Sequence, residues 1–428
     1  MSSGITISGS QRPEAPRRWR TRLRYLGPGI VLAAAGIGAG DMVTSLSGAA
    51  EHGMGLLWVV VVGVVVKFAI TEAVGRLHLA TGRTPMASIR SAGRWLPWVF
   101  LVFLAVIGLV YGAALSSVAA LAAKALIPGL PVTPLAIGLA LASGALVLVG
   151  RYGAFERVMM GFTLLMFVGV IAAAVAMLGA MDNPGDVLAT LRPSMPAGSI
   201  MTVLALIGGV GGSAGIAAYG YWVREKGWRE SGWLPVMRAD SAISYLMIVV
   251  FVAGLSVLGT GLLYGTGQSI AGTEGLAALA DPLGAMLGTV PRLMFLVSFF
   301  FVVVSSIVGG FNGLGFLMAD CVRVIRGIPE AEADRHMAIT STPFRVVIGY
   351  FMAASAVIVF TGKPVGLVLL YALFGSLILP ILSGALLYLL NKRSIDSAYR
   401  NSLASNIGLS SALVLFAVLG VAQIAEMF

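Results

Sequence analysis

The chain has 428 residues, of which 58% are hydrophobic and only 11% are charged. A soluble domain carries about 25% charged residues, so this composition excludes most soluble folds and indicates a membrane protein. The net charge of +10 sits in short segments between apolar stretches, so we expect no nucleic-acid partner. The single cysteine, Cys321, excludes an intrachain disulfide.

The chain begins with a polar, arginine-rich tail over residues 1–25, which we expect to lie in the cytoplasm against anionic headgroups. A helix needs about 20 apolar residues to cross the hydrocarbon layer of a bilayer. Eleven apolar stretches come close to or exceed this length. We therefore predict eleven transmembrane helices, near 26–50, 55–77, 95–122, 132–150, 157–180, 198–222, 237–263, 291–319, 344–361, 365–390 and 404–427.

Basic residues test this topology, because cytoplasmic loops are enriched in Lys and Arg. With the N-terminus inside, 23 of the 28 Lys and Arg residues fall in the tail or in inner segments, one (Lys67) falls within a span, and four fall outside: Lys124, Arg192, Arg292 and Lys363. We therefore expect a cytoplasmic N-terminus and an external C-terminus. The expected setting is the lipid bilayer of a bacterial inner membrane, with the protein as a monomer.

Two spans contain unusual glycine clusters. The first span is interrupted over Gly36–Asp41 and the sixth over Gly208–Gly215. Each glycine costs about 1 kcal/mol of helix propensity relative to alanine, so these clusters favour local unwinding. The glycines could instead allow close helix packing.

The two breaks lie five spans apart, so the second copy enters the membrane in the opposite orientation. This predicts a first inverted repeat over 26–180, a second over 198–390, and an extra C-terminal span over 404–428. Matching broken helices in two inverted halves point to the central site of a secondary transporter.

Asp41 is the main candidate for a charged group at this site. A carboxylate at membrane depth is expensive and marks a functional position. Beside unwound carbonyls it suits a hard cation, because such ions take oxygen ligands. Asp41 could also cap the helix that follows the break, and the two roles can coexist.

Other polar residues within spans have two interpretations each. Lys67 and Glu72 could line a vestibule, although we favour a snorkelling Lys67 and a Glu72 that neutralises a nearby arginine. Asn312 could bind a coupling ion or bond across helices. Ser305, Ser306 and Ser376 could line the cavity, but such serines more often bond a backbone carbonyl. Asp320 and Arg323 are expected to form a surface pair.

Several motifs are similar to those of the Nramp (natural resistance-associated macrophage protein) family. Gly27-Pro28-Gly29, the Gly38–Asp41 break, Leu56–Val59 and Leu79–Gly82 follow the order and spacing of that family. The resemblance implies a LeuT-like fold and transport of divalent transition metals, commonly coupled to protons.

The same resemblance exposes changes at the metal ligands. The family's Asp-Pro-Gly-Asn corresponds to Gly38, Ala39, Gly40 and Asp41, so the carboxylate has moved from the first place to the fourth. The family's Met-Pro-His corresponds to Ala214–Ile216, and a tenth-span Gln to Ile378. The soft thioether is missing, which favours a harder ion such as Mg²⁺ or Mn²⁺.

We therefore expect an all-α membrane protein of LeuT-like fold that moves a divalent metal cation by alternating access, as a symporter. The expected site combines Asp41 as the metal ligand with Ala35, Gly38, Gly211, Ser213, Ala214, Asn312 and Ser376. The alternatives are a transporter of a small amine-bearing solute and a receptor without transport. We expect no cofactor beyond a bound cation, and no enzyme, because the sequence has no His-Glu-x-x-His run and no Walker A loop.

Overall fold

The computed structural model of the chain describes residues 25–149, 152–181, 183–195, 200–266, 275, 279–361 and 364–425. All but the last residue of the predicted N-terminal tail lies outside this part. Every predicted span corresponds to helix. The segment predicted to form the first repeat contains α2 (Pro28–Gly36), α3 (Ala39–His52), α4 (Leu57–Thr81), α5 (Pro85–Arg90), α6 (Leu96–Leu126), α7 (Val132–Val149) and α8 (Tyr152–Ala180).

The second half begins after the short helix α9 (Pro184–Ala189). It contains α10 (Ile200–Gly209), α11 (Ala214–Glu225), α12 (Leu234–Leu263), α14 (Ala280–Leu287), α15 (Thr289–Ile325), α16 (Ala333–Met337), α17 (Thr342–Ile358), α18 (Pro364–Leu390) and α19 (Leu403–Ala425). Short 3₁₀ turns lie at Gly53–Leu56, Ser231–Trp233, Glu330–Glu332, Val359–Thr361 and Ser397–Tyr399.

The described residues include nine helical runs that are long and apolar enough to cross a membrane. One of these runs, Ala39–Thr81, joins α3 to α4 and so contains parts of two predicted spans. The split sixth span, α10 and α11, is not among the nine because each half is short. The nine runs are therefore compatible with eleven crossings.

Both predicted breaks are present, and they touch each other. α2 ends at Gly36 and α3 begins at Ala39, while α10 ends at Gly209 and α11 begins at Ala214. Gly211 and Gly212 have φ values of +81° and +58°, a left-handed conformation that glycine adopts without steric cost. A Cβ on Gly212 would lie 2.8 Å from the Cα of Gly36, so the two backbones meet where only glycine fits.

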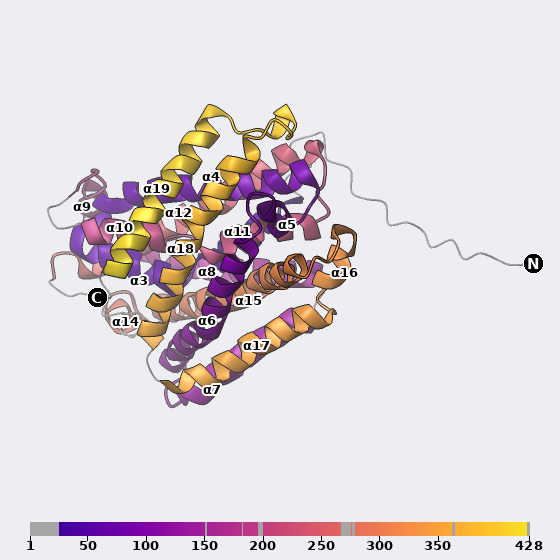
Figure 1. Cartoon of the computed structure of the whole chain (residues 1–428). Helices are drawn as coiled ribbons and strands as arrows, with labels where there is room; N and C mark the ends of the chain where they lie inside the picture. Colours follow the sequence, from indigo (N-terminus) through magenta and orange to yellow (C-terminus); the bar gives the residue numbers. More distant parts are fainter. Residues whose placement is uncertain are drawn as a thin grey trace, which may run out of the picture.

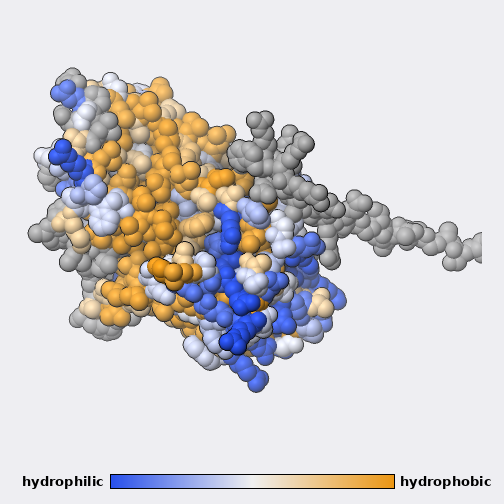
Figure 2. Space-filling view, turned by 90° about the horizontal axis from the view of Figure 1, so that it is seen from above, coloured by the Kyte–Doolittle hydropathy of each residue, from blue (hydrophilic) through white to orange (hydrophobic). Residues whose placement is uncertain are grey.

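Long helices surround this junction. α15 packs along α6 and α8, α12 packs on α3 and α4, and α19 lies along α18. Figure 1 shows α7 and α17 side by side at one edge of the bundle, and α18 with α19 crossing another face. Figure 2 shows a wide hydrophobic area on one face, with hydrophilic residues gathered towards its ends. This distribution fits a protein embedded in lipid.

Side-chain contacts gather the segments predicted to lie inside at one end of the bundle. Arg76 donates to the Tyr399 carbonyl, Arg90 to the Val324 carbonyl, and Lys226 to Glu156. At the other end, the Thr190 hydroxyl accepts the N–H of Met54, and Ser194 N–H donates to the Gly55 carbonyl. These contacts match the predicted alternation of loops. We call the end of the bundle that contains Arg76, Arg90 and Lys226 the arginine-rich end.

Candidate functional site

The carboxylate of Asp41 joins the two helix breaks. Its Oδ2 accepts the N–H of Gly38 at 2.7 Å, and its Oδ1 accepts the N–H of Gly211 at 2.6 Å. The side chain is buried, with 3% of the residue exposed. Asp41 is the third residue of α3, so it caps this helix from inside the first turn rather than from the residue before it. Hydrogen bonds from backbone N–H groups to a carboxylate are among the stronger ones in proteins.

Lys67 supplies the opposite charge at the same junction. It lies in the middle of α4 and is completely buried. Its Nζ donates to the Gly208 carbonyl at 2.9 Å and to the Val210 carbonyl at 2.6 Å, and its charge interacts with that of Asp41. The predicted snorkelling of Lys67 is therefore wrong, because the ammonium group finds carbonyl partners in the core and does not reach the surface.

Serines of α15 satisfy the end of α2. Ser305 Oγ donates to the Ala34 carbonyl at 2.8 Å, and Ser306 Oγ donates to the Ile37 carbonyl at 2.6 Å. The Tyr111 hydroxyl on α6 donates to the Ser306 carbonyl at 2.7 Å. The last carbonyls of a helix have no partner within the helix, and these hydroxyls provide one for two of them. The interpretation of both serines as partners of backbone carbonyls is confirmed.

The other predicted site residues divide into two groups. Gly38, Asp41 and Gly211 meet at the junction, and Ala35 lies next to it, where a Cβ on Gly309 of α15 would collide with it. Ser213 precedes α11 and makes no capping hydrogen bond through its side chain. Ala214 is the first residue of α11, at the edge of the same break.

Asn312 and Ser376 point to partners other than the helix breaks. Asn312 Oδ1 accepts the indole N–H of Trp222 at 2.8 Å, which joins α15 to α11. Asn312 Nδ2 is buried and has no hydrogen-bond partner among the described residues. Ser376 Oγ donates to the Leu373 carbonyl and bonds Gln423 of α19. In this arrangement the Asn312 Oδ1 and the Ser376 hydroxyl make contacts between helices.

A buried carboxylate holds the start of α2, a role that the sequence did not reveal. Asp240 of α12 accepts the N–H groups of Gly27 and Gly29 at 2.9 and 2.6 Å, and the Tyr219 hydroxyl of α11 at 2.9 Å. Lys226, just after α11, pairs with Glu156 of α8. No sequence pattern connects Asp240 with the two glycines, and Asp240 itself lies near a predicted span end.

Three arginines link further elements at the arginine-rich end. Glu72 accepts from Arg76 at 3.0 Å and from Arg238 at 2.8 Å, which confirms the predicted neutralising role of Glu72. Asp320 does pair with Arg323, at 2.7 Å, but the prediction of a surface pair is wrong because both residues are almost fully buried. Tyr221 also donates to Asp320, and Arg323 reaches Thr84 and Glu330. The interior position follows from the packing of α5 and α16 over this helix end.

Ion pairs continue in the loop after α15. Arg224 bonds Glu330 at 2.9 Å and Asp334 at 2.7 Å, and Arg229 also bonds Asp334. Burial by itself would raise the pKa of Asp334, but the bonds from Arg224 and Arg229 outweigh it and hold the pKa below its usual value. Together with Asp240, these pairs join α2, α5, α11, α12, α15 and α16 at the arginine-rich end.

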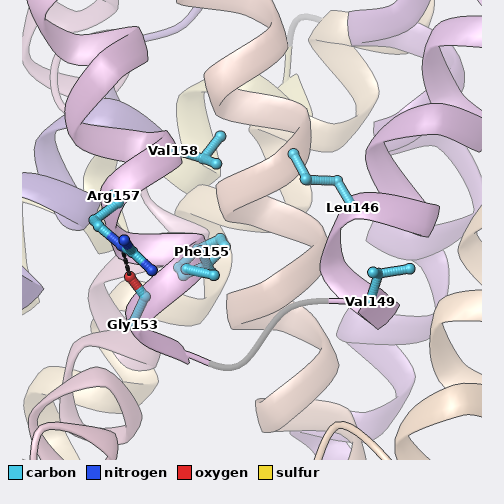
Figure 3. A pocket seen from close by; sticks show the side chains of 7 residues that line it. Leu146, Val149, Gly153, Phe155, Arg157 and Val158 are labelled. Atoms are coloured by element: carbon cyan, nitrogen blue, oxygen red, sulfur yellow. Dashed lines mark hydrogen bonds between the residues drawn. The ribbon is translucent and has the colours of Figure 1, made fainter.

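A separate hollow lies on the outside of the bundle between α7 and α8 (Figure 3). Apolar side chains, including those of Leu146, Val149 and Phe155, form most of its lining. Arg157 is the charged residue there, and its Nε donates to the Gly153 carbonyl at 3.2 Å. None of the described residues that line the hollow carries a carboxylate, the charged oxygen ligand that a hard cation prefers. Within the described ranges, no group of three or more His, Cys, Asp and Glu residues is placed to hold a metal ion.

Comparison with known proteins gives one family. Residues 29–426 match the family model described as natural resistance-associated macrophage protein-like. A stretch of 65 residues is 37% identical to the metal transporter Nramp6.2 of Populus trichocarpa, covering 15% of this chain and 12% of that protein. A stretch of 103 residues is 30% identical to the divalent metal cation transporter MntH of Deinococcus radiodurans, covering 23% of this chain and 22% of that protein. These matches therefore span less than a quarter of either relative.

The fold is similar over a much greater length. The manganese transporter of Eremococcus coleocola, solved with an aromatic bis-isothiourea compound, matches with a TM-score of 0.74 and 16% identity, covering 100% of this chain and 92% of that one. A mutant of the same transporter matches with a TM-score of 0.73 and 17% identity, covering 98% of this chain and 91% of that one. The predicted all-α membrane fold of LeuT-like class is confirmed.

Proposed function

Because this chain belongs to the natural resistance-associated macrophage protein family, we propose that it is a secondary-active transporter of a divalent metal cation. The observation that supports this most is the buried Asp41 carboxylate at the meeting point of two broken helices. Relatives named as divalent metal cation and manganese transporters support the cargo class. Mn²⁺ and Mg²⁺ are the ions that we propose.

Oxygen atoms supply the proposed binding site. Asp41 provides the negative charge, and carbonyl oxygens of Ala35 and Gly211, with water molecules, complete the shell. Hard divalent ions prefer such ligands, and Mg²⁺ commonly keeps several waters. The backbone N–H groups of Gly38 and Gly211 donate to the Asp41 carboxylate. Binding of a cation would therefore replace these hydrogen bonds with metal–oxygen bonds.

Alternating access would use the two ends of the molecule differently. At the arginine-rich end, Asp240, the Asp320–Arg323 pair and the bonds of Arg224 hold several helices together. We place this end in the cytoplasm, on the strength of the basic residues. Movement of the two proposed repeats, 26–180 and 198–390, against each other would break these contacts and open the path. The chain is proposed to work as a monomer in a bacterial inner membrane.

Uptake into liposomes tests the proposal. We expect the wild-type chain to move Mn²⁺ or Mg²⁺ and Asp41→Asn to lose at least about tenfold in uptake, which corresponds to about 1.4 kcal/mol. Asp396→Asn is the matched control, since the exposed Asp396 also accepts a backbone N–H, from Ala398. No uptake of Mn²⁺, Mg²⁺ or Ca²⁺ by the wild type would refute the proposal. Equal uptake by wild type and Asp41→Asn would refute the role of Asp41.

A small amine-bearing solute is the second candidate. The Lys67 ammonium, which is buried and donates to the carbonyls of Gly208 and Val210 at the same break, supports this candidate. Thermal unfolding in the presence of metals and of organic amines separates the two candidates, because a ligand stabilises the state that it binds. Stabilisation by amines but not by metals would favour the organic substrate.

A further inference from the structure

Lys67 is surrounded by groups that bind cations. Its Nζ lies 2.9 Å from the Gly208 carbonyl oxygen, 2.6 Å from the Val210 carbonyl oxygen and 5.7 Å from the centre of the Phe416 ring on α19. The residue is 0% exposed, so the ammonium group lies away from the solvent-accessible surface. Two carbonyls and an aromatic face are typical partners for a monovalent cation.

These carbonyls come from the C-terminus of α10, where a helix presents partial negative charge. The last carbonyls of a helix lack partners within the helix, and the helix dipole favours a cation at this end. The α10 helix stops at Gly209, inside the membrane-spanning part of the chain, where lipid and packed helices offer few alternative donors. The carbonyls here therefore need donors from the chain itself, and the dipole of α10 favours a donor that carries positive charge.

Lys67 also balances the charge of the junction. Asp41 brings one negative charge and Lys67 one positive charge, and the two interact. Tyr245 on α12 faces the same stretch of α4, but it is neutral and its hydroxyl bonds Thr71 at 2.6 Å. A buried charge is tolerated when hydrogen bonds satisfy it, and the Lys67 ammonium donates to the carbonyls of Gly208 and Val210.

We propose that Lys67 is a built-in cation that fills a monovalent-cation subsite at the broken end of α10. The subsite comprises the carbonyls of Gly208 and Val210 and the Phe416 ring, and its ligand class is a monovalent inorganic ion or a small primary ammonium. With Lys67 in place, the protein takes no such ion from solution at this position. The side chain also ties α4 to the break between α10 and α11.

Removal of the ammonium group should open the subsite to free ions. The test uses the purified full chain in detergent and follows thermal unfolding of Lys67→Met in chloride salts of Na⁺, K⁺, NH₄⁺, methylammonium and choline at one ionic strength. We expect Lys67→Met to unfold several degrees lower in choline than in at least one of the small cations, with a saturable dependence on that ion. The wild type should show no such difference, since its subsite is occupied.

Two further variants make the result specific. Lys392→Met removes a lysine that lies over the Tyr388 ring, 4.3 Å from its centre, and should show no cation preference. If Lys67→Met does not fold, Lys67→Gln replaces it, because the amide donates to a carbonyl without supplying charge. Equal stability of the Lys67 variant in choline and in all small cations would overturn the proposal. So would a wild-type response as large as that of the variant.

A transport measurement extends the inference and rests on the proposed function. Metal uptake by the wild type should not depend on Na⁺ or K⁺, whereas uptake by Lys67→Met should require the ion that stabilises it. Uptake by Lys67→Met that is equal with and without that ion would overturn the inference while leaving the proposed function intact. If neither protein moves metal, the proposed function fails, and the unfolding experiment still decides the role of Lys67.

Discussion

Opening of the arginine-rich end should depend on Asp240. This buried carboxylate accepts three hydrogen bonds, from the N–H groups of Gly27 and Gly29 and from the Tyr219 hydroxyl. It thereby holds the start of α2 against α11 and α12. Asp240→Asn keeps the shape of the side chain but turns one acceptor oxygen into an NH₂ group, which faces a donor instead of accepting from it.

The expected magnitude follows from these three bonds. A hydrogen bond to a charged group contributes about 1.5–3 kcal/mol, and a buried donor left without a partner costs about 1–3 kcal/mol. Because the remaining amide oxygen of the variant still accepts some of these three hydrogen bonds, we expect the closed state to lose about 3 kcal/mol of stability. At about 1.4 kcal/mol per factor of ten, the open state gains about two orders of magnitude in population.

Cys321 reports this opening without any engineered label. It is the single cysteine of the chain, lies in α15 beside Asp320, and is 0% exposed. A water-soluble maleimide can react with it only when this end opens, so its labelling rate follows the open population. We expect Asp240→Asn to label up to about 100-fold faster than the wild type, in proportion to that gain.

Asp396→Asn serves as the control, since it removes an exposed carboxylate at the same end and should label at the wild-type rate. A lower unfolding temperature of Asp240→Asn with an unchanged labelling rate of Cys321 would refute the proposed role of Asp240 in opening. That outcome would show that the bonds of Asp240 stabilise the fold equally in the closed and open states.

Two other predictions concern backbone conformation and pH. Gly212→Ala should destabilise the chain by more than Gly82→Ala in thermal unfolding. Both glycines have positive φ, which costs an L-residue about 1–2 kcal/mol. Only Gly212 also faces the Gly36 backbone, whereas a Cβ on Gly82 meets nothing within 4 Å. Equal losses would mean that the two breaks do not touch. Burial and then the charges of Arg323 and Arg326 lower the pKa of His336 below its ordinary value of 6.5. The unfolded chain therefore binds the proton more readily, so stability from this group is present above pH 6.5 and falls as the pH drops below it. The unfolding temperature of His336→Gln, relative to that of the wild type, should rise as the pH is lowered from about 7.5 to about 5.5. A difference that does not change with pH would contradict this prediction.

Much of the architecture could be predicted from the sequence because lipid imposes a simple rule on composition. Apolar length sets each span, and the basic loops set the alternation of the two ends. The glycine clusters at Gly36–Asp41 and Gly208–Gly215 also indicated the breaks, since glycine propensity acts locally. These features need no knowledge of which helices pack together.

The chemistry within the site was less accessible, because it depends on contacts between distant segments. The pattern around Lys67 fits either a snorkelling side chain or a buried one, and only the carbonyls of Gly208 and Val210, 141 and 143 positions away, decide between them. Asp240 gave no signal for the same reason, since its partners Gly27 and Gly29 lie 213 and 211 positions earlier. The burial of Asp320 and Arg323 likewise depends on segments that fold over the end of α15.

The contacts of Asp41 and Lys67 suggest why a site with so few charged ligands can still respond to a cation. Asp41 binds the start of α3 and the break before α11, while Lys67 binds the carbonyls at the end of α10. Each charge therefore holds a half-helix end of opposite dipole, and each also attracts the other. A cation that binds Asp41 competes with its backbone N–H partners and weakens its attraction for Lys67 at once. One binding event would thus loosen both broken helices together, which is the coupling that alternating access requires.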